Sequence, residues 1–350
     1  MNKEPTLSII LAVYNVEKYI TRAINSILSQ DYEDYEIILC DDGSTDSSGE
    51  ICDRFASENE KISVIHKPNG GVSSARNAGF SKARGKYIYF MDPDDYILEN
   101  LLPDNIALAI KYDADQVVFG FNTVISDTSD GFLGSNEHKL NISGKYSFDE
   151  FKNNYIQHIT QVPHVVWNRI YKRSSIGDIR FNENNTTADD AEFNLNLLYK
   201  GFSTIYYNDN IYYVYVSRQN SIMNRFNPNR FDNEIKVTDG QVLLVKAWGL
   251  TDILDKYFSC SYVETMLTEY TNMTMQNCNL SSGEIVKRIK AFHEDARVQK
   301  AFSRINAGDL KGFGLKVLYI LTKLKWYRSA LAFKRKYNPL IVFSHKVLRR

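Results

Sequence analysis

Three acidic side chains directly follow a short hydrophobic run near residue 90. The run Tyr87–Met91 leads into Asp92, Pro93, Asp94 and Asp95. Carboxylates inside a buried strand would be costly, but at the end of a strand they can bind a divalent cation. Mg²⁺ usually takes one or two carboxylates together with phosphate oxygens of a substrate. We therefore expect Asp92 and Asp94 to form a Mg²⁺ or Mn²⁺ site, whereas an ordinary turn explains Asp95 equally well.

Polar side chains also end two earlier apolar segments. Tyr14 and Asn15 close the segment of residues 7–14, and Asp41 and Asp42 follow the next one. A carboxylate at this place can accept the imide N–H of uracil or hold a ribose hydroxyl, although a simple turn is an alternative. The ring of Tyr14 can stack on a base or belong to the core. A nucleotide is the ligand that fits both segments.

A pair of glycines precedes a helical pattern that contains Arg76. Gly70 and Gly71 permit close approach of the backbone, and the N-terminus of a helix favours phosphate. Arg76 can pair with a pyrophosphate or with the aspartates, or it is a surface charge. Because the chain has no GxGxxG motif here, a dinucleotide site is not indicated.

Two adjacent acids, Asp189 and Asp190, begin a second helical pattern. Acids at the start of a helix often only complement the helix dipole. A group transfer without a covalent intermediate, however, needs a carboxylate as general base towards the accepting hydroxyl. These are the best placed acids for that role in the second half of the chain.

The elements that must position these residues alternate between strand and helix over the first 120 residues. Nearly continuous apolar strands separated by helical patterns predict an α/β fold with a mostly parallel, doubly wound sheet. Ligands of such sheets bind at the carboxyl ends of the strands, where the polar residues lie. The expected strands are Leu7–Tyr14, Glu36–Cys40, Ile62–His66, Tyr87–Met91 and Asp115–Phe121, and the expected helices are Val16–Ser29, Ser47–Ser57, Val72–Ala83 and Leu98–Tyr112.

The composition narrows the class of protein. The 350 residues carry a net charge of zero, which gives no signal for nucleic-acid binding. The four cysteines form no CxxC pair, so we expect a reducing compartment such as the cytoplasm. We find no signal peptide and no apolar stretch of about 20 residues that would span a membrane.

The C-terminal segment is an exception to the balanced charge. Residues 311–350 contain eleven Lys or Arg and no acid, interleaved with aromatic and aliphatic residues. A basic amphipathic helix of this kind can lie on an anionic membrane surface. Packing against the rest of the protein is an equally good alternative.

With these motifs in order, the chain resembles family 2 glycosyltransferases of the GT-A fold, in particular bacterial enzymes that build capsular and extracellular polysaccharides. The residues that carry the resemblance are SIILAVYN, LCDDGSTD, NGGVSSARNAG, FMDPDD, WNRIYKRS and TADDAEFN, within residues 5–225. The resemblance implies a Rossmann-like GT-A domain over residues 1–230, with a nucleotide-binding half (1–122) and an acceptor half (123–230). A mainly helical region, residues 231–350, would follow.

The resemblance also implies roles for individual residues. Asp92 and Asp94 match the DXD element, with Asp94 as the direct metal ligand and Asp92 near the ribose. Asp190 matches the proposed base, and Asp189 replaces the glutamate that usually precedes it. The remaining roles are to hold the nucleotide sugar (Ala12, Tyr14, Asn15, Asp41, Asp42, Arg76 and Pro93), to contact the acceptor (Asp189, and Trp167 unless its ring is buried) and to close over the diphosphate (Arg218 and Ser221).

We therefore expect a metal-dependent inverting glycosyltransferase that moves a hexose or N-acetylhexosamine from a UDP-sugar to a hydroxyl of a glycan. The expected acceptor is lipid-linked, at the inner face of the plasma membrane, and a homo-oligomer is compatible with the sequence. One alternative is a non-catalytic GT-A partner of another transferase. A nucleotidyltransferase is disfavoured, because the segment VYNVEKY lacks the usual Gly-rich, Lys-containing loop.

Overall fold

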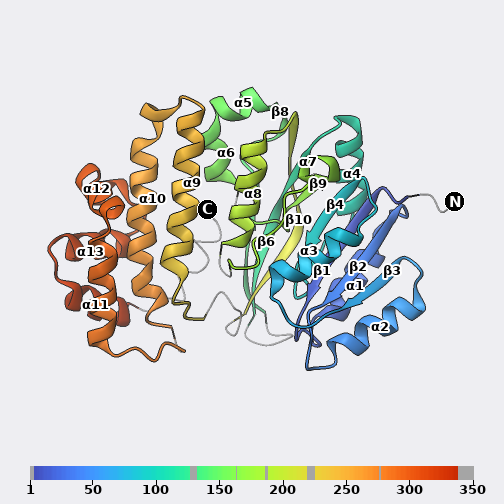
Figure 1. The fold of residues 1–350 in the computed structure, drawn as a ribbon, viewed down its shortest axis with the longest axis horizontal. Coiled ribbons are helices and arrows are strands. Elements are labelled where there is room, and N and C mark those ends of the chain that lie inside the picture. Colours follow the sequence, from blue (N-terminus) through green and yellow to red (C-terminus); the bar gives the residue numbers. More distant parts are fainter. Residues whose placement is uncertain are drawn as a thin grey trace. The chain divides into compact units, whose positions relative to one another are not determined.

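The computed structural model describes residues 4–126, 132–162, 164–185, 188–218, 225–275 and 277–337. The chain divides into two compact units, residues 1–219 and residues 220–347 (Figure 1). The first unit contains the sheet and the second is helical.

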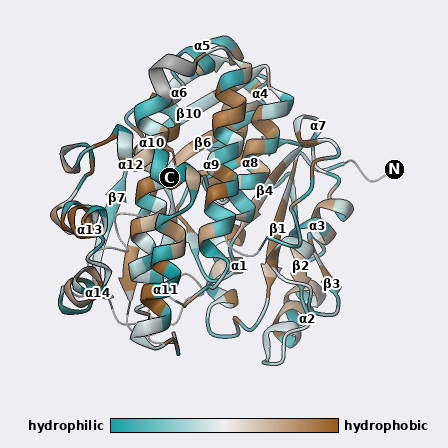
Figure 2. Cartoon of the chain, turned by 60° about the vertical axis from the view of Figure 1, so that its left-hand side comes forward, coloured by the Kyte–Doolittle hydropathy of each residue, from teal (hydrophilic) through white to brown (hydrophobic). Residues whose placement is uncertain are grey.

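Four parallel strands form the first half of the sheet, in the order β3-β2-β1-β4. Strand β1 is buried at six of its seven positions, and Figure 2 shows it mostly in the brown of hydrophobic residues. Strands β2 and β4 are buried at every position, so the prediction of strands covered on both faces is confirmed for β1, β2 and β4. Strand β3, at the edge of the sheet, has only Ile62 buried. The bounds are Leu7–Val13 (β1), Tyr35–Asp41 (β2), Ile62–His66 (β3) and Tyr87–Met91 (β4).

The second half of the sheet is mixed. The short strand β9 lies antiparallel between β4 and β6, and β10 pairs parallel with β6. Six of the strands in the described residues therefore run in one direction, and the mostly parallel α/β class is confirmed. The bounds are Tyr96–Ile97 (β5), Gln116–Ser126 (β6), Phe132–His138 (β7), Gly144–Ser147 (β8), Arg169–Lys172 (β9) and Thr204–Arg218 (β10).

Strand β7 lies within residues 126–144, a segment rich in Ser, Asp, Asn and Gly. Strand β7 pairs antiparallel with the end of β6, from Phe121↔His138 to Ser126↔Phe132. Its sequence, FLGSNEH, has no strong apolar alternation. Pairing with the long neighbouring strand, rather than intrinsic propensity, accounts for this element.

Helices cover the sheet by burying one apolar face each. In α1 the buried residues recur at helical spacing (Ile20, Ala23, Ile24 and Ile27). Helices α3 and α8 share a core with β1, β2 and β4 that includes Ile10, Phe90 and Phe193. The bounds in this unit are Ile20–Leu28 (α1), Ser48–Glu58 (α2), Val72–Lys82 (α3), Leu101–Lys111 (α4), Phe148–Asn153 (α5), Tyr155–Gln161 (α6), Arg173–Ile176 (α7) and Asp189–Lys200 (α8).

The second unit confirms the mainly helical C-terminal region. It has a core of its own, in which Met266, Leu267 and Tyr270 of α10 pack against residues of the later helices. None of the helices in the described part of the chain is long and apolar enough to span a bilayer. The bounds are Arg230–Ala247 (α9), Thr251–Asn272 (α10), Ser282–His293 (α11), Ala296–Arg304 (α12), the 3₁₀ turn Ala307–Asp309 (η2), Phe313–Lys323 (α13) and Tyr327–Lys336 (α14).

Candidate active site

Arg76 of α3 brings three carboxylates together. Its Nη1 donates to Asp190 Oδ1 at 2.6 Å and to Asp189 Oδ2 at 3.2 Å, and its Nη2 donates to Asp92 Oδ1 at 2.9 Å. Arg76 is buried. Asp92 follows β4, whereas Asp189 and Asp190 form the first turn of α8. One guanidinium thus connects two motifs that are about 100 residues apart in sequence.

The two acids of α8 are fixed by further hydrogen bonds. Asp190 Oδ2 accepts from the backbone N–H of Val166 at 3.1 Å, and Asp189 Oδ2 accepts from Ser73 Oγ at 3.2 Å. Asp190 therefore has one oxygen on Arg76 and the other on the backbone. A carboxylate oxygen can accept two hydrogen bonds, so Asp190 keeps acceptor capacity for a substrate hydroxyl.

Burial shifts the pKa values of the carboxyl groups in this cluster. It raises the pKa of Asp189 to about 6, with a further rise from the charge of Asp190. Burial also raises the pKa of Asp190 against the opposing effect of Arg76, and it raises the pKa of Asp92. Burial alone would lower the pKa of Arg76, but Asp190, Asp92 and Asp189 raise it above its ordinary range. A carboxylate whose pKa is raised is a better proton acceptor near neutral pH.

Two arginines lie against Asp94. Arg218, the last residue of β10, donates from Nη1 to Asp94 Oδ2 at 2.6 Å, and Arg22 of α1 donates from Nη2 to the Asp94 carbonyl at 3.0 Å. The guanidinium of Arg22 also covers the ring of Tyr96 at 4.6 Å. Its Nε is buried without a hydrogen-bond partner among the described residues. The sequence predicts Arg218 near the diphosphate but gives no sign of its bond to Asp94. It does not predict Arg22, because nothing in the helical pattern distinguishes that residue.

Asp95 has a structural role. It is buried, with Oδ2 accepting from the Tyr213 hydroxyl at 2.6 Å and Oδ1 accepting from the Val216 N–H at 2.7 Å. These bonds tie the acidic turn to β10. Pro93 is buried beside it.

The chemistry of these acids fits a divalent metal. Asp92 and Asp94 are partly exposed, and both offer the oxygen ligands that Mg²⁺ and Mn²⁺ prefer. In the described ranges no third His, Cys, Asp or Glu joins them in a group that could hold a metal by itself. The pair therefore fits a cation whose other ligands are phosphate oxygens and water.

The two acids at the end of β2 are both bonded within the protein. Asp42 accepts from Lys67 Nζ at 2.5 Å and from the backbone N–H groups of Gly70 and Gly71 at 3.0 and 2.7 Å. Its carboxylate thus holds the glycine turn that precedes α3. Asp41 accepts from the Ser44 N–H and contacts His66 Nδ1 at 2.9 Å, and these bonds lower its pKa against the opposing effect of burial.

The first strand end presents an aromatic ring to solvent. Tyr14 is 46% exposed, and Asn15 has a positive φ of 52°. The Asn15 Oδ1 accepts from the Thr45 N–H at 2.8 Å, so the loops after β1 and β2 are joined. Ala12, near the end of the strand, is half-buried. The exposed Tyr14 ring is in a position to stack on a base.

Trp167 lies in the interior. Its ring stacks on Tyr213 at 4.4 Å with an interplanar angle of 16°, and only 3% of the residue is exposed. The ring of Trp167 is therefore buried, which was the alternative to stacking on an acceptor sugar. Ser221, expected near the diphosphate, lies outside the described residues.

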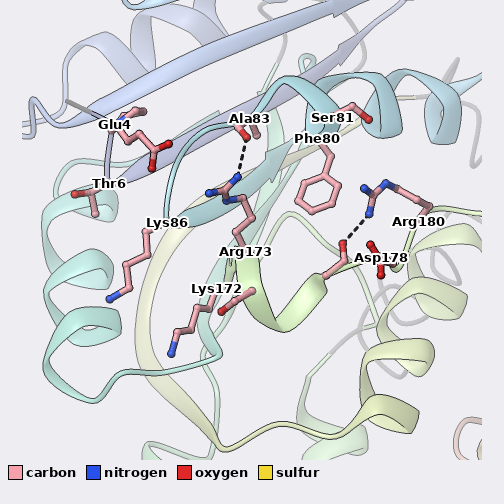
Figure 3. Close-up of a pocket in the computed structure, with 13 residues that line it drawn as sticks. Glu4, Thr6, Phe80, Ser81, Ala83, Lys86, Lys172, Arg173, Asp178 and Arg180 are labelled. Atoms are coloured by element: carbon pink, nitrogen blue, oxygen red, sulfur yellow. Dashed lines mark hydrogen bonds between the residues drawn. The ribbon is translucent and has the colours of Figure 1, made fainter. Parts of the chain in front are cut away.

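A separate pocket lies at the opposite end of the strands. Figure 3 shows Lys86, Lys172, Arg173 and Arg180 around it, near the residues that precede β1 and β4. Lys172 is paired with Asp113 at 2.7 Å, and Arg173 and Arg180 donate to backbone carbonyls. None of the predicted site residues lines this pocket, so it is not the candidate active site.

The comparisons with known proteins agree with this fold. Residues 8–180 match the model of a family described as glycosyl transferase family 2, and this part of the chain belongs to that family. The family resemblance in the sequence is thereby confirmed.

Two curated proteins illustrate the similarity in sequence. The chain is 34% identical over 220 residues to EpsJ of Bacillus subtilis, described as an uncharacterized glycosyltransferase, covering 62% of this chain and 63% of EpsJ. It is 40% identical over 111 residues to the hyaluronan synthase of Pasteurella multocida, covering 32% of this chain and 11% of that protein. The chain thus spans less than two thirds of the length of these relatives.

The fold resembles that of S. aureus TarS. A crystal structure of TarS superposes with a TM-score of 0.64 at 19% identity, over 95% of this chain and 91% of that chain. TarS has also been solved in complex with UDP-GlcNAc, with a TM-score of 0.62 to this chain. This similarity establishes the GT-A fold.

Proposed function

We propose that the protein is a metal-dependent inverting glycosyltransferase of bacterial surface polysaccharide synthesis. It would transfer a hexose or N-acetylhexosamine from a UDP-sugar to a hydroxyl of a glycan acceptor. The observation that carries the proposal is the bridge made by Arg76 between Asp92 and Asp190. The bridge keeps Asp190 close to Asp92 at the end of β4, and this closeness supports Asp190 as the general base next to the proposed diphosphate site.

Asp190 serves as the general base in this proposal. It takes the proton of the acceptor hydroxyl, whose oxygen attacks the anomeric carbon on the face opposite the nucleotide. The C–O bond to the diphosphate then breaks, and UDP leaves with the bonding electrons. A divalent cation on Asp94 and Asp92 would neutralise the negative charge of that diphosphate. Arg76 and the Val166 N–H orient the carboxylate of Asp190.

The nucleotide is assigned to the ends of β1 and β2. Tyr14 offers an exposed ring, and Asn15, Asp41 and Asp42 form a loop cluster stabilised by internal hydrogen bonds. The complex of TarS with UDP-GlcNAc supports a UDP-sugar as the donor, because the two chains share their fold. The relatedness to a hyaluronan synthase supports a glycan as the acceptor.

The proposed partners include a membrane. We assign the acceptor to a lipid-linked glycan and the protein to the inner face of the plasma membrane. The basic segment that begins at Lys311 supports this assignment, because it carries no acid. A homo-oligomer is compatible with the proposal.

The decisive experiment measures UDP release from a panel of UDP-sugars, in the presence of Mn²⁺ or of EDTA. We expect metal-dependent release from one sugar. Release of pyrophosphate instead of UDP would indicate a nucleotidyltransferase. If no sugar reacts with or without glycan acceptors, while calorimetry shows UDP binding, the protein is a non-catalytic nucleotide-binding partner.

A further inference from the structure

Helix α13 is apolar on two opposite sides. One side packs into the core of the second unit through Leu318 and Tyr319. The other side carries Phe313, Ile320 and Leu324, and since they are seven and eleven residues apart they align on one face. Val317 lies between them on the same face, half-buried. We call Phe313, Val317, Ile320 and Leu324 the outer stripe.

The outer stripe is exposed. Phe313 is 72% exposed, Leu324 52% and Ile320 47%, and Trp326, just beyond the helix, is 57% exposed. Among the described residues these four and Tyr337 make up nearly half of the large hydrophobic side chains that face solvent. Such a concentration on one short segment marks an interaction surface, whereas isolated exposed hydrophobic residues do not.

Positive charge surrounds this stripe. Residues 311–337 contain eight Lys or Arg and no acid. Lys316 and Lys323 occupy helix positions adjacent to those of Phe313 and Ile320. Lys316 is half-buried, and Lys323 is exposed, with its Nζ donating to the Tyr319 hydroxyl at 2.9 Å. Across the described residues, none of the eight cations forms an ion pair with a carboxylate. Lys334 is buried, but the other seven cations are exposed or half-buried, and their charge is available to an external partner.

We propose that the outer stripe and its flanking lysines are a docking surface for a bilayer with anionic head groups. An interfacial helix buries its apolar face at the boundary between head groups and acyl chains, while lysines at its sides contact lipid phosphates. Trp326 belongs at the same level, where aromatic rings with a polar edge are favoured.

Charge distinguishes a bilayer from a second copy of the chain. Two copies meeting through this surface would bring together two sets of cations without a compensating acid, which is unfavourable. An anionic bilayer supplies the opposite charge together with an apolar phase. The inference names the residues through which this chain would contact the membrane of the proposed function, and it rests on that proposal for its biological purpose. Lipid binding itself can be measured without catalysis.

The test compares flotation of the full chain with two kinds of vesicle. One contains only phosphatidylcholine, and the other contains about one third phosphatidylglycerol. We expect the wild-type protein to float with the anionic vesicles, and Phe313→Ser with Ile320→Ser to lower the partition coefficient by about tenfold or more. The matched control is Leu243→Ser on α9, which removes a side chain of 59% exposure outside the stripe and should change nothing.

A second pair of variants tests the charge. Lys316→Glu with Lys323→Glu should also abolish most of the vesicle binding. Because salt screens the attraction of the wild-type protein to anionic lipid, the difference between wild type and variant should become smaller as the salt concentration rises. Lys287→Glu with Lys290→Glu on α11 makes the same change in net charge on another helix of the same unit. Equal losses in both charge pairs would show that net charge, not this surface, attracts the vesicles, and would overturn the inference.

Fluorescence locates the contact. Bilayer binding should shift the emission of Trp326 to shorter wavelength and allow quenching by brominated lipids, and Trp326→Phe should remove both signals. Unchanged flotation of the Phe313/Ile320 variant would refute the bilayer as partner. The bilayer would also be refuted if, without lipid, the wild-type protein self-associated in sedimentation and this variant did not. UDP binding of the same samples, measured without vesicles, reports separately on the proposed function.

Discussion

Asp190 is the side chain on which the proposed chemistry depends most. Its carboxylate lies between Arg76 and the Val166 N–H, and burial raises its pKa. We expect Asp190→Asn to lower sugar transfer by about 10²- to 10⁴-fold, the usual contribution of general-base catalysis. Since the base contacts the acceptor and not the nucleotide, UDP affinity in calorimetry should stay unchanged. Turnover close to that of the wild type would exclude Asp190 as the base.

Arg76 also has a measurable structural role. Removing one partner of a buried ion pair leaves charge without compensation and typically costs about 3–5 kcal/mol. We expect Arg76→Gln to lower the free energy of unfolding by about that amount in urea titrations.

The control for Arg76 is an exposed pair. Lys86 and Asp113 lie 3.8 Å apart at the surface, and Lys86→Gln should cost less than about 1 kcal/mol. If the two variants were equally stable, the buried ion pairs of Arg76 with Asp92, Asp189 and Asp190 would not contribute to stability as predicted.

The candidate residues could be predicted where a strand end marks them. Tyr14, Asp42 and Asp92 each follow an apolar run, so periodicity alone placed them at one edge of the sheet. Arg22 could not be found in this way, since only the packing of α1 against the turn at Asp94 gives it a partner. The sequence also left Asp95 open between a turn and a metal site, and its two buried hydrogen bonds to β10 settle that it supports the turn.

At the scale of elements, α3 owes its position to a close approach at Gly79. A Cβ at this residue would lie 2.5 Å from Ile10 Cγ2 and 2.8 Å from Cys40 Sγ, both on central strands. We expect Gly79→Ala to destabilise the first unit by about 1–3 kcal/mol through overpacking, and to reduce activity, because α3 also carries Arg76.

Gly314 provides the comparison for Gly79. It lies in α13, and among the described residues no atom outside the adjoining backbone of this helix and the two neighbouring residues lies within 4 Å of the position that a Cβ would occupy there. Gly314→Ala should therefore be neutral or stabilise by up to about 1 kcal/mol through helix propensity. A similar effect of both substitutions in thermal unfolding would show that α3 can move away from β1 at little cost.

Helix α14 carries a lysine that burial disfavours. Lys334 is buried, and desolvation lowers its pKa to about 8. Its unfolded pKa is higher, so the unfolded chain binds more protons between these values and stability should rise as pH increases from 8 to about 10.5. Lys334→Met should stabilise the second unit by about 1–3 kcal/mol at neutral pH and remove this rise. Urea titrations at several pH values would reveal a flat profile in the variant, and an unchanged profile would contradict the assignment.

The elements differ in how well periodicity predicts them. Strands β1, β2 and β4 and helix α1 were predicted because their apolar patterns are strong and local. Strand β9 has only four residues, and its place between β4 and β6 depends on long-range pairing that a local pattern does not contain. Helix α13 likewise depends on distant residues. It has apolar side chains on two sides, and only the packing of the second unit shows which side is buried.

At the scale of the whole molecule, the two units have separate hydrophobic cores. We therefore expect two calorimetric unfolding transitions. UDP at about 100 times its dissociation constant should stabilise only the first unit, by about 2.7 kcal/mol, and Lys334→Met should raise only the transition of the second unit. A single transition that both changes shift together would show that the units unfold cooperatively.

The bridge formed by Arg76 has a consequence for chimeric enzymes. It joins a cation supplied by the first hundred residues to an acid supplied by the start of α8. A hybrid that takes its donor-binding segment from one relative and its acceptor-binding segment from another would have to keep this pair matched across the junction. The segment that carries Arg76 and the segment that carries Asp190 should therefore come from the same relative. Segments that contain neither residue are free of this constraint.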